Sequence, residues 1–282
     1  MSPEGDVRIV GSVLVRNEDV HIERAIRNAA DACDRIHVLD HLSTDRTPEI
    51  LAALSAELAH IEVRRSADAG DSHRDLEQYV GTPTWVLVVD GDCLFDPAGL
   101  RRLRNDLLDG AHSEAFRVRG HVLHCDRLDA GSRTASGFMA PPSRWIVQLF
   151  NFAALESWTG CPERVHGGTP VFRAGYDWQR VDDLTETTTW DDDPLRLLHV
   201  CFLRRSSRDG SEWGEGRPNL NEEGAYRRGL SGRLRRIVRR PSLDPRVRAA
   251  RREGRNWKQD KYRRGPRVDV DATPFAPLEV SA

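Results

Sequence analysis

Apolar runs and helical periodicity alternate along the first 110 residues of the chain. Short runs of β-branched and aliphatic residues predict buried strands at residues 9–15, 35–39, 61–63 and 85–89. In the segments that follow, apolar residues recur every three or four positions, which predicts helices near residues 22–33, 50–58, 71–79 and 97–108. Strands and helices that alternate in this way form mostly parallel sheets through right-handed crossovers. The pattern therefore predicts an α/β fold.

Polar residues stand where each of these helices is expected to begin. The predicted N-caps are Asp19, Thr44 or Asp45, Asp71 or Ser72, and Asp96, which Pro97 follows at the first helical position. Side-chain oxygens at such positions accept hydrogen bonds from the first unpaired backbone N–H groups of a helix.

The hydrophobic pattern is less regular after residue 110. Strands are still predicted at residues 114–123, 145–150 and 197–203. Residues 126–142 are rich in Gly, Ser, Arg and Pro, which predicts a long loop, and such loops often cover a functional site.

From about residue 206 the composition shifts to Arg, Gly and Ser, and basic helices are predicted near residues 222–238 and 245–254. We therefore divide the chain into a domain of residues 1–205 and a basic, mainly helical C-terminal extension of residues 206–282. The domain is divided again at residue 110, where the regular alternation ends.

Composition narrows the class of protein. Charged residues make up 30% of the chain and hydrophobic residues 39%, with a formal net charge of −2. The five cysteines are an odd number without a Cys-x-x-Cys pair, which argues against a disulfide framework and a zinc ribbon. We see no signal-peptide pattern and no apolar run long enough to cross a bilayer. These features predict a cytoplasmic protein.

Positive charge is concentrated between residues 227 and 267, and negative charge between residues 182 and 193. The arginines of the basic stretch are predicted to contact anionic lipid headgroups or a lipid-linked acceptor, which would associate the protein with a membrane surface. An alternative is a solvated helical face that pairs with the acidic stretch. Nucleic acid is not a predicted partner, because few aromatic residues accompany these arginines.

Acidic side chains follow the predicted strands where ligands bind in an open α/β sheet. The fourth strand ends at Asp90-Gly91-Asp92, and the second ends at Asp40. Two carboxylates at a strand end can hold a divalent cation against a phosphate, and glycine between them permits close approach of the backbone. The alternative for one such strand end is an ordinary Asp-Gly turn. Acidic groups at several neighbouring strand ends favour a binding site.

These motifs resemble family 2 glycosyltransferases, the nucleotide-sugar-dependent enzymes with the GT-A fold. The matching segments are Val15–Glu18, Val38–Thr47 and Val88–Asp92, in the same order and at similar spacing. The resemblance covers residues 9–110 and weakens toward residue 205. It implies a GT-A-like, Rossmann-like sheet with a nucleotide-binding half, residues 1–110, and an acceptor half, residues 111–205.

The resemblance also implies roles for individual residues. Asp40 would bind the nucleobase, Arg16, Asn17 and Glu18 would line the nucleotide pocket, and Arg74 would lie near the uridine or the diphosphate. Asp90 and Asp92 would contact ribose and a metal ion, Mg²⁺ or Mn²⁺. The ion would neutralise the departing nucleoside diphosphate, while a carboxylate base activates the acceptor hydroxyl.

A second group of residues continues the resemblance with departures. Segment 144–150, Trp158-Thr159-Gly160 and Val165-His166 match an Arg-x-Phe strand, a Trp-x-Gly and a His-Glu pair, but Gly167 replaces the glutamate. The catalytic base is therefore sought among Glu163, Asp182 and Asp183, with Glu163 and Asp183 as the predicted pair of catalytic residues. His199 resembles the late histidine that completes the metal shell in some of these enzymes, and the alternative is a buried core histidine.

Two further features have plainer interpretations. Leu42 and Arg46 stand where the family usually has glycine, which predicts a differently shaped loop after the second strand. His121 and His124 are not predicted to bind zinc, because strand residues three apart face opposite sides and no second ligand pair follows at zinc spacing.

The sequence thus predicts an inverting glycosyltransferase with a nucleotide-diphosphate sugar as donor and an unknown glycan, lipid-linked or small-molecule acceptor. A nucleotidyltransferase on a similar sheet is one alternative. A non-catalytic binding or scaffolding protein that retains a glycosyltransferase-like domain is another.

Overall fold

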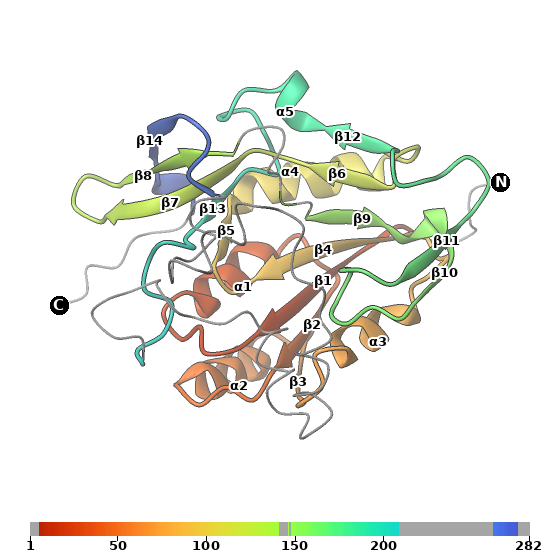
Figure 1. The fold of residues 1–282 in the computed structure, drawn as a ribbon, viewed down its shortest axis with the longest axis horizontal. Coiled ribbons are helices and arrows are strands. Elements are labelled where there is room, and N and C mark those ends of the chain that lie inside the picture. The colour runs from red at the N-terminus through yellow and green to blue at the C-terminus, as the bar shows by residue number, and fades with distance from the viewer. Residues whose placement is uncertain (1–5, 141–145, 147, 209–261, 276–282) are drawn as a thin grey trace, which may run out of the picture.

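Parallel strands form the centre of the larger of two main sheets (Figure 1). The computed structural model describes residues 6–140, 146, 148–208 and 262–275. The larger sheet has the strand order β12-β6-β9-β4-β1-β2-β3. Its members are β1 (Arg8–Val15), β2 (Arg35–Asp40), β3 (Ile61–Arg65), β4 (Thr84–Asp90), β6 (Arg117–Arg119), β9 (Leu149–Asn151) and β12 (Val181–Asp183). Strands β4, β1, β2 and β3 run parallel, and β9 is antiparallel to both of its neighbours. This is the predicted α/β architecture.

Helices cover both faces of this sheet because its strands are apolar on both sides. The helices are α1 (Ile22–Ala30), α2 (Thr47–Glu57), α3 (Asp71–Glu77), α4 (Pro97–Leu108) and the short α5 (Leu184–Thr187). Alternate residues of β1 enter different cores: Ile9 packs with α1, α2 and α4, whereas Val10 packs with Leu76 of α3. Such two-sided burial is typical of central parallel strands.

The structure agrees with some of the predicted N-cap residues and not with others. Asp96 caps α4 by accepting a hydrogen bond from Ala98 N at 2.9 Å. The prediction for Asp19 is wrong, because His21 is the N-cap residue of α1 and the Asp19 carboxylate instead accepts from Ser207 N at 2.6 Å. Asp45 accepts from Thr47 N at 3.0 Å, just ahead of α2.

A second sheet, of order β14-β8-β7-β13-β5, packs beside the first. Its strands are β5 (Cys93–Phe95), β7 (Val122–Asp129), β8 (Thr134–Met139), β13 (Leu197–His199) and β14 (Arg267–Asp271). Strands β7 and β8 form an antiparallel hairpin, so the long loop predicted over residues 126–142 is wrong for residues 126–129 and 134–139, and residues 130–133 form the turn between them. The run of small and polar residues was misleading, because Ala135 and the two residues after it are buried in this sheet.

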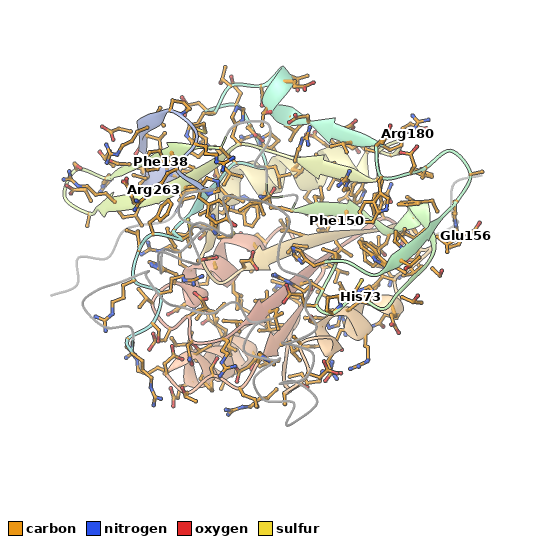
Figure 2. All side chains as sticks on the ribbon, in the orientation of Figure 1. His73, Phe138, Phe150, Glu156, Arg180 and Arg263 are labelled. Carbon is orange, nitrogen blue, oxygen red and sulfur yellow. The ribbon has the colours of Figure 1, made fainter. Side chains whose placement is uncertain are left out.

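The end of the described chain returns to this second sheet. Strand β14 pairs antiparallel with β8, and Phe275 of the 3-10 turn Thr273–Phe275 is buried in the main core. Arg263 lies against the Phe202 ring, which in turn contacts Phe138 (Figure 2). Residues 262–275 therefore pack against the folded core, whereas the division of the chain into residues 1–205 and 206–282 stays a prediction. The helices predicted at 222–238 and 245–254 lie outside the described residues.

One buried side-chain amide links the first helix to two segments that are distant in the sequence. The Asn28 Nδ2 group on α1 donates to the carbonyl oxygens of Phe95 and Phe275, at 2.7 and 3.0 Å. A smaller hairpin, β10 (Leu155–Thr159) with β11 (Thr169–Phe172), follows the 3-10 turn Phe152–Ala154. Its Trp158 is buried in the second core. Among the described residues, no helix has the length and apolar character needed to span a membrane.

Candidate functional site

The register of the parallel strands brings the predicted acidic residues to one edge of the sheet. Val15 of β1 pairs with Asp40 of β2, and Leu14 of β1 pairs with Asp90 of β4. The two aspartates therefore flank the carboxyl end of β1, with one strand between them. This is the edge at which open α/β sheets bind ligands.

The loop after β1 is held to the loop after β2. Asn17 adopts a left-handed backbone (φ 53°), and its Oδ1 accepts a hydrogen bond from Thr44 N at 2.7 Å. Asn17 N donates to Ser43 Oγ at 2.9 Å, and Glu18 N donates to Thr47 Oγ1 at the same distance. The predicted nucleotide-pocket residues Asn17 and Glu18 thus lie in a fixed loop between the two aspartate-bearing strands. Arg16, which precedes them, is partly buried.

Asp40 is fully buried and holds the turn that follows its strand. Its Oδ1 accepts from Ser43 N at 2.8 Å, and its Oδ2 lies 3.4 Å from Arg65 Nε. Leu42 within this turn has φ 56°, a left-handed conformation that glycine adopts without strain. The loop therefore keeps a glycine-like backbone although its residue is leucine.

Gly91 permits the close contact between the β1 loop and the Asp90–Asp92 turn. A Cβ atom at position 91 would lie 2.9 Å from Glu18 Cγ and 3.0 Å from Glu18 Cβ. Those distances are shorter than van der Waals contact, so any other residue here would push Glu18 away. The glycine between the two aspartates is thus required by packing against Glu18.

Asp92 lies in a buried cluster of opposite charges. Its Oδ2 accepts a hydrogen bond from Arg205 Nη1 at 2.5 Å and lies 3.6 Å from His199 Nε2. Arg205 Nη1 also lies 3.5 Å from Glu18 Oε1. Burial alone would raise the pKa of the Asp92 carboxyl, but Arg205 and His199 outweigh it and hold that pKa well below its usual range. Asp92 is therefore an anion that cations already surround.

His199 is the matching cation of this cluster. Burial lowers its pKa, but the negative charges of Cys201 and Asp92 outweigh burial and raise the pKa of His199 to about 10. His199 is predicted to lie near the Asp90 and Asp92 carboxylates, and it lies beside Asp92. Its role as a ligand of that metal stays a prediction.

Asp90 has a separate arginine partner. Arg164 Nη1 forms an ion pair with Asp90 Oδ1, and Arg164 is almost completely buried while Asp90 keeps 31% of its side chain exposed. Burial lowers the pKa of Arg164, but the carboxylates of Asp90 and Glu163 outweigh it and raise that pKa. Glu163 thus belongs to the same charged cluster. Its role as a catalytic residue stays a prediction.

Residues after β13 close the other side of the β1 loop. Ser206 Oγ donates to Asp45 Oδ2 at 2.6 Å, and Ser207 N donates to Asp19 Oδ1 at 2.6 Å. Asp19 and Asp45 therefore fix the segment that carries Arg205. Their carboxylates have structural partners, which matches the helix-start interpretation of Asp45 better than a ligand role.

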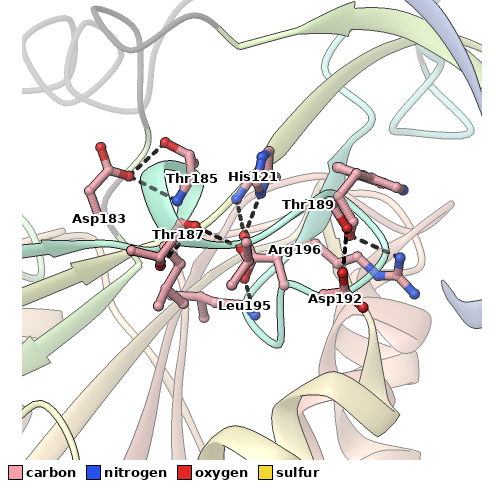
Figure 3. Close-up of polar contacts among 12 residues, drawn as sticks. His121, Asp183, Thr185, Thr187, Thr189, Asp192, Leu195 and Arg196 are labelled. Carbon is pink, nitrogen blue, oxygen red and sulfur yellow. Dashed lines mark hydrogen bonds and ion pairs between the residues drawn. The ribbon is translucent and has the colours of Figure 1, made fainter.

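Two predicted site residues lie elsewhere. Arg74 is largely exposed and pairs with Asp68 and Asp71, whereas Arg65 is the arginine that lies at Asp40. Asp183 ends β12, which lies three strands away from β4 in the sheet order. At ordinary strand spacing, this separates Asp183 from the end of β4 by about 14 Å, measured across the strands. It pairs with Arg119 at 2.9 Å and accepts from Thr185 at the start of α5 (Figure 3). A base must be within hydrogen-bond reach of its proton. The sheet order separates Asp183 from Asp90 and Asp92, and its role as a catalytic residue stays a prediction.

The Trp-x-Gly and His-Gly segments pack against each other. Trp158 Nε1 donates to Gly167 O at 3.0 Å, and His166 N donates to Glu163 O at the same distance. Gly167 has φ 74°, so the residue that replaces the expected glutamate serves a left-handed turn. Arg144, Trp145 and Val147 lie outside the described residues.

Sequence reasoning missed the three arginines of the site, Arg65, Arg164 and Arg205. Arg65 is the last residue of β3, whereas Arg164 and Arg205 lie outside helices and strands, where periodicity gives no signal. The available signal was chemical: every buried carboxylate needs a partner, and few lysines exist to supply one.

Comparison with known proteins gives limited results. No family model matches the chain. A TPR repeat-containing protein of Synechococcus elongatus is 32% identical over 106 residues, which are 38% of this chain and 25% of that protein. The match thus spans about a quarter of the curated relative's length.

Solved structures match the chain only in part. Glucosyl-3-phosphoglycerate synthase from Mycobacterium tuberculosis, in complex with Mn²⁺, UDP and glucosyl-3-phosphoglycerate, is 23% identical, with a TM-score of 0.32 and coverage of 41% of this chain and 44% of that one. The mannosyltransferase PcManGT from Pyrobaculum calidifontis, in complex with GDP-Man and Mn²⁺, is 20% identical, with a TM-score of 0.31 and coverage of 44% and 37%. S. aureus TarS is 18% identical, with a TM-score of 0.30 and coverage of 43% and 22%. Structural similarity at these TM-scores does not show the function of this chain, so its function must be inferred from its own residues.

Proposed function

We propose that the chain is a metal-dependent glycosyltransferase that moves a sugar from a nucleotide-diphosphate sugar to an acceptor hydroxyl. The observation that carries the proposal is the strand register. It brings Asp40 and the Asp90–Asp92 turn to the same sheet edge, on either side of the Asn17–Glu18 loop. One carboxylate is thereby available for a nucleobase and a pair is available for a cation and its phosphates.

Under this proposal the nucleobase binds at Asp40. Its Oδ1 is occupied by Ser43 N, and no hydrogen bond from the described residues reaches Oδ2, which faces Arg65. A carboxylate oxygen in that position can accept a hydrogen bond from a nucleobase N–H. Arg65 takes the basic role predicted for Arg74. Arg16, Asn17 and Glu18 line the same pocket.

The carboxylates of Asp90 and Asp92 would hold Mg²⁺ or Mn²⁺. Their oxygen donors suit a hard cation that is shared with phosphate, and the partial exposure of Asp90 leaves a path to solvent. The bound ion would supply charge neutralisation to the departing diphosphate. Arg164 and Arg205, which pair with these aspartates in the protein alone, are placed to contact phosphate oxygens once the carboxylates have other partners.

Glu163 is the proposed base for an inverting displacement. It lies beside Arg164, whose guanidinium also pairs with Asp90, so the carboxylate belongs to the cluster that faces the sugar. In this role Glu163 accepts the proton of the acceptor hydroxyl as the sugar's anomeric carbon is attacked. The short backbone bridge between Glu163 and His166 orients this segment.

The proposal is tested by titrating the protein with UDP and with GDP, with Mn²⁺ and with EDTA, by calorimetry. Affinity for one diphosphate should rise about tenfold or more with Mn²⁺, because the cation bridges phosphate and carboxylate. Asp92→Asn should lose this gain. Asp31→Asn, a surface aspartate with 70% of its side chain exposed, should keep it.

Incubation with nucleotide sugars then tests the chemistry. Slow hydrolysis that releases a nucleoside diphosphate supports sugar transfer. Pyrophosphate formation from a nucleoside triphosphate would favour nucleotidyl transfer instead, and binding without turnover of any donor would favour a non-catalytic protein. If Mn²⁺ had no effect on diphosphate binding, the proposed binding of a cation by Asp90 and Asp92 would be refuted.

A further inference from the structure

Two buried histidines from neighbouring strands meet beside the acidic cluster. His124 lies on β7 and His199 on β13, and the parallel register pairs these two residues directly. Their Nδ1 atoms are 2.8 Å apart, and both side chains are buried. Side chains at paired positions of adjacent strands point to the same face of the sheet, so the contact follows from the backbone.

Cys201 adds a third donor to this pair. It follows His199 by two residues, and its Sγ atom and one ring nitrogen from each histidine all lie within 4.8 Å of one another. Cys201 is partly exposed, whereas both histidines are buried. Two imidazoles and a thiol form a soft donor set that the proposed sugar transfer does not use.

The other edge of the His199 ring faces a carboxylate. Asp92 Oδ2 lies 3.6 Å from Nε2, which leaves Nδ1 facing His124. An imidazole whose second nitrogen faces a carboxylate is the usual arrangement of a metal-ligating histidine, because the carboxylate fixes the tautomer and the ring orientation. This is evidence for a ligand that does not depend on the donor set itself.

An aromatic ring from the end of the chain covers the cluster. The Tyr262 ring centroid lies 4.4 Å from that of His124 and 5.2 Å from that of His199. Tyr262 is well separated in sequence from both histidines, so the cluster joins three parts of the chain. Its cover limits access of water from that side.

We propose that His124, His199 and Cys201 bind a transition-metal ion of the zinc class, separate from the hard cation at Asp90 and Asp92. The ligand atoms would be the two Nδ1 atoms and the Cys201 thiolate, with a fourth position open to solvent. Tetrahedral Zn²⁺ separates such ligand atoms by about 3.3–3.8 Å, so the two Nδ1 atoms must move apart by about half an ångström and both rings must turn toward a common ion.

The proposal gives His199 a role other than the one predicted from the sequence. Thiolate and imidazole favour Zn²⁺ over Mg²⁺ or Mn²⁺, whereas carboxylates and phosphates favour the reverse. The zinc-class ion would fix His199 and the turn that leads to Arg205, and thereby the partners of Asp92. Its binding does not require the proposed sugar transfer.

The test loads the metal-free full-length chain with Co²⁺, a spectroscopic substitute for Zn²⁺, and records absorption. Co²⁺ bound by a thiolate gives a strong near-ultraviolet charge-transfer band, which should saturate at about one equivalent. Cys201→Ala should abolish the band. Cys125→Ala, which removes the buried thiol next to His124 in sequence, is the matched control and should keep it.

A second measurement does not depend on a folded variant. Zn²⁺ should slow alkylation of Cys201 in the wild-type chain by about tenfold or more, as read by mass spectrometry of each cysteine, because a coordinated thiolate is a poor nucleophile. Equal alkylation rates with and without Zn²⁺ would overturn the proposal.

Two results separate this site from the proposed function. Loss of Mn²⁺-dependent diphosphate binding in Cys201→Ala would mean that these residues serve the diphosphate's own cation, and would refute a separate site. A cobalt–thiolate band in a chain that binds no diphosphate would support the site while refuting the sugar-transfer proposal. A wild-type chain without that band would show that the two histidines merely share a proton.

Discussion

Arg205 Nη1 lies 2.5 Å from Asp92 Oδ2, although the two residues are 113 positions apart in the sequence. The same guanidinium lies 3.5 Å from Glu18. It therefore joins the turn after β4, the loop after β1 and the segment after β13. In the protein alone, this arginine supplies the positive charge that a divalent cation would supply beside Asp92.

Replacing this charge should destabilise the protein, and Mn²⁺ should restore part of the loss. Arg205→Met leaves Asp92 and Glu18 with fewer cationic partners, which should lower the free energy of unfolding by about 3–5 kcal/mol. Urea unfolding with and without Mn²⁺ measures both effects. Arg101→Met removes an exposed pair with Asp31 and should cost less than about 1 kcal/mol. Equal Mn²⁺ stabilisation of Arg205→Met and wild type would show that the ion does not replace the guanidinium.

The two predicted catalytic carboxylates should differ in their effect on turnover. Glu163→Gln should lower donor hydrolysis by about a hundredfold or more while leaving diphosphate affinity within a few-fold, because a general base contributes to the chemical step. Asp183→Asn retains an N-cap side chain for α5 and should keep near-normal turnover. Release of nucleoside diphosphate from the preferred donor provides the measurement. If Asp183→Asn were the inactive variant, the assignment of the base would have to be reversed.

The turn after β2 offers a test of backbone strain. Leu42 has φ 56°, which costs an L-residue about 1–2 kcal/mol, so Leu42→Gly should leave thermal stability unchanged or raise it despite the lost apolar surface. Leu108→Gly in the last turn of α4 should instead lower stability by about 1 kcal/mol. Calorimetric melting of the two variants gives the comparison. Similar losses in both would mean that the Leu42 side chain matters more than its backbone.

His21 should make the chain less stable in mild acid. Burial, followed by the charge of Arg24, lowers the pKa of His21 to about 4 from the ordinary 6.5. A histidine with a lowered pKa in the folded state binds its proton more readily when unfolded, so its effect is absent above pH 6.5 and grows as the pH falls toward 4. The loss at pH 5 is about 2 kcal/mol relative to pH 7. His21→Gln should flatten the pH dependence of urea unfolding over this window by a similar amount, and an unchanged profile would exclude His21 as its source.

The parallel half of the fold was predictable because its residues repeat a simple pattern. The runs that became β1, β2 and β4 are apolar on both faces, and such runs suit central parallel strands. Asp96 and Pro97 also carry a local signal for the start of α4. The β7–β8 hairpin could not be read in the same way. Its Ala, Ser and Gly residues resemble a loop, and only pairing with β14 explains their burial.

The candidate site was predictable only in part, for a similar reason. Asp40, Asp90 and Asp92 follow strands directly, so the register of the sheet brings them together. Arg164 and Arg205 reach these carboxylates from distant segments, through contacts that no local pattern encodes. Arg74 and Asp183 lie away from these carboxylates, because motif spacing fixes order along the chain, whereas position in the fold depends on tertiary pairing.

The hydrogen bonds from Asn28 to Phe95 and Phe275 have a consequence for biosynthesis. The first helix is synthesised long before Phe275, so its buried amide meets one of its acceptors only after the chain has been made as far as that residue. Until then, Asn28 must remain hydrated or incompletely paired, and the apolar surface that Phe275 covers stays open. Completion of this part of the native structure is therefore coupled to the synthesis of Phe275, and nascent chains that stop short of Phe275 should depend on chaperones.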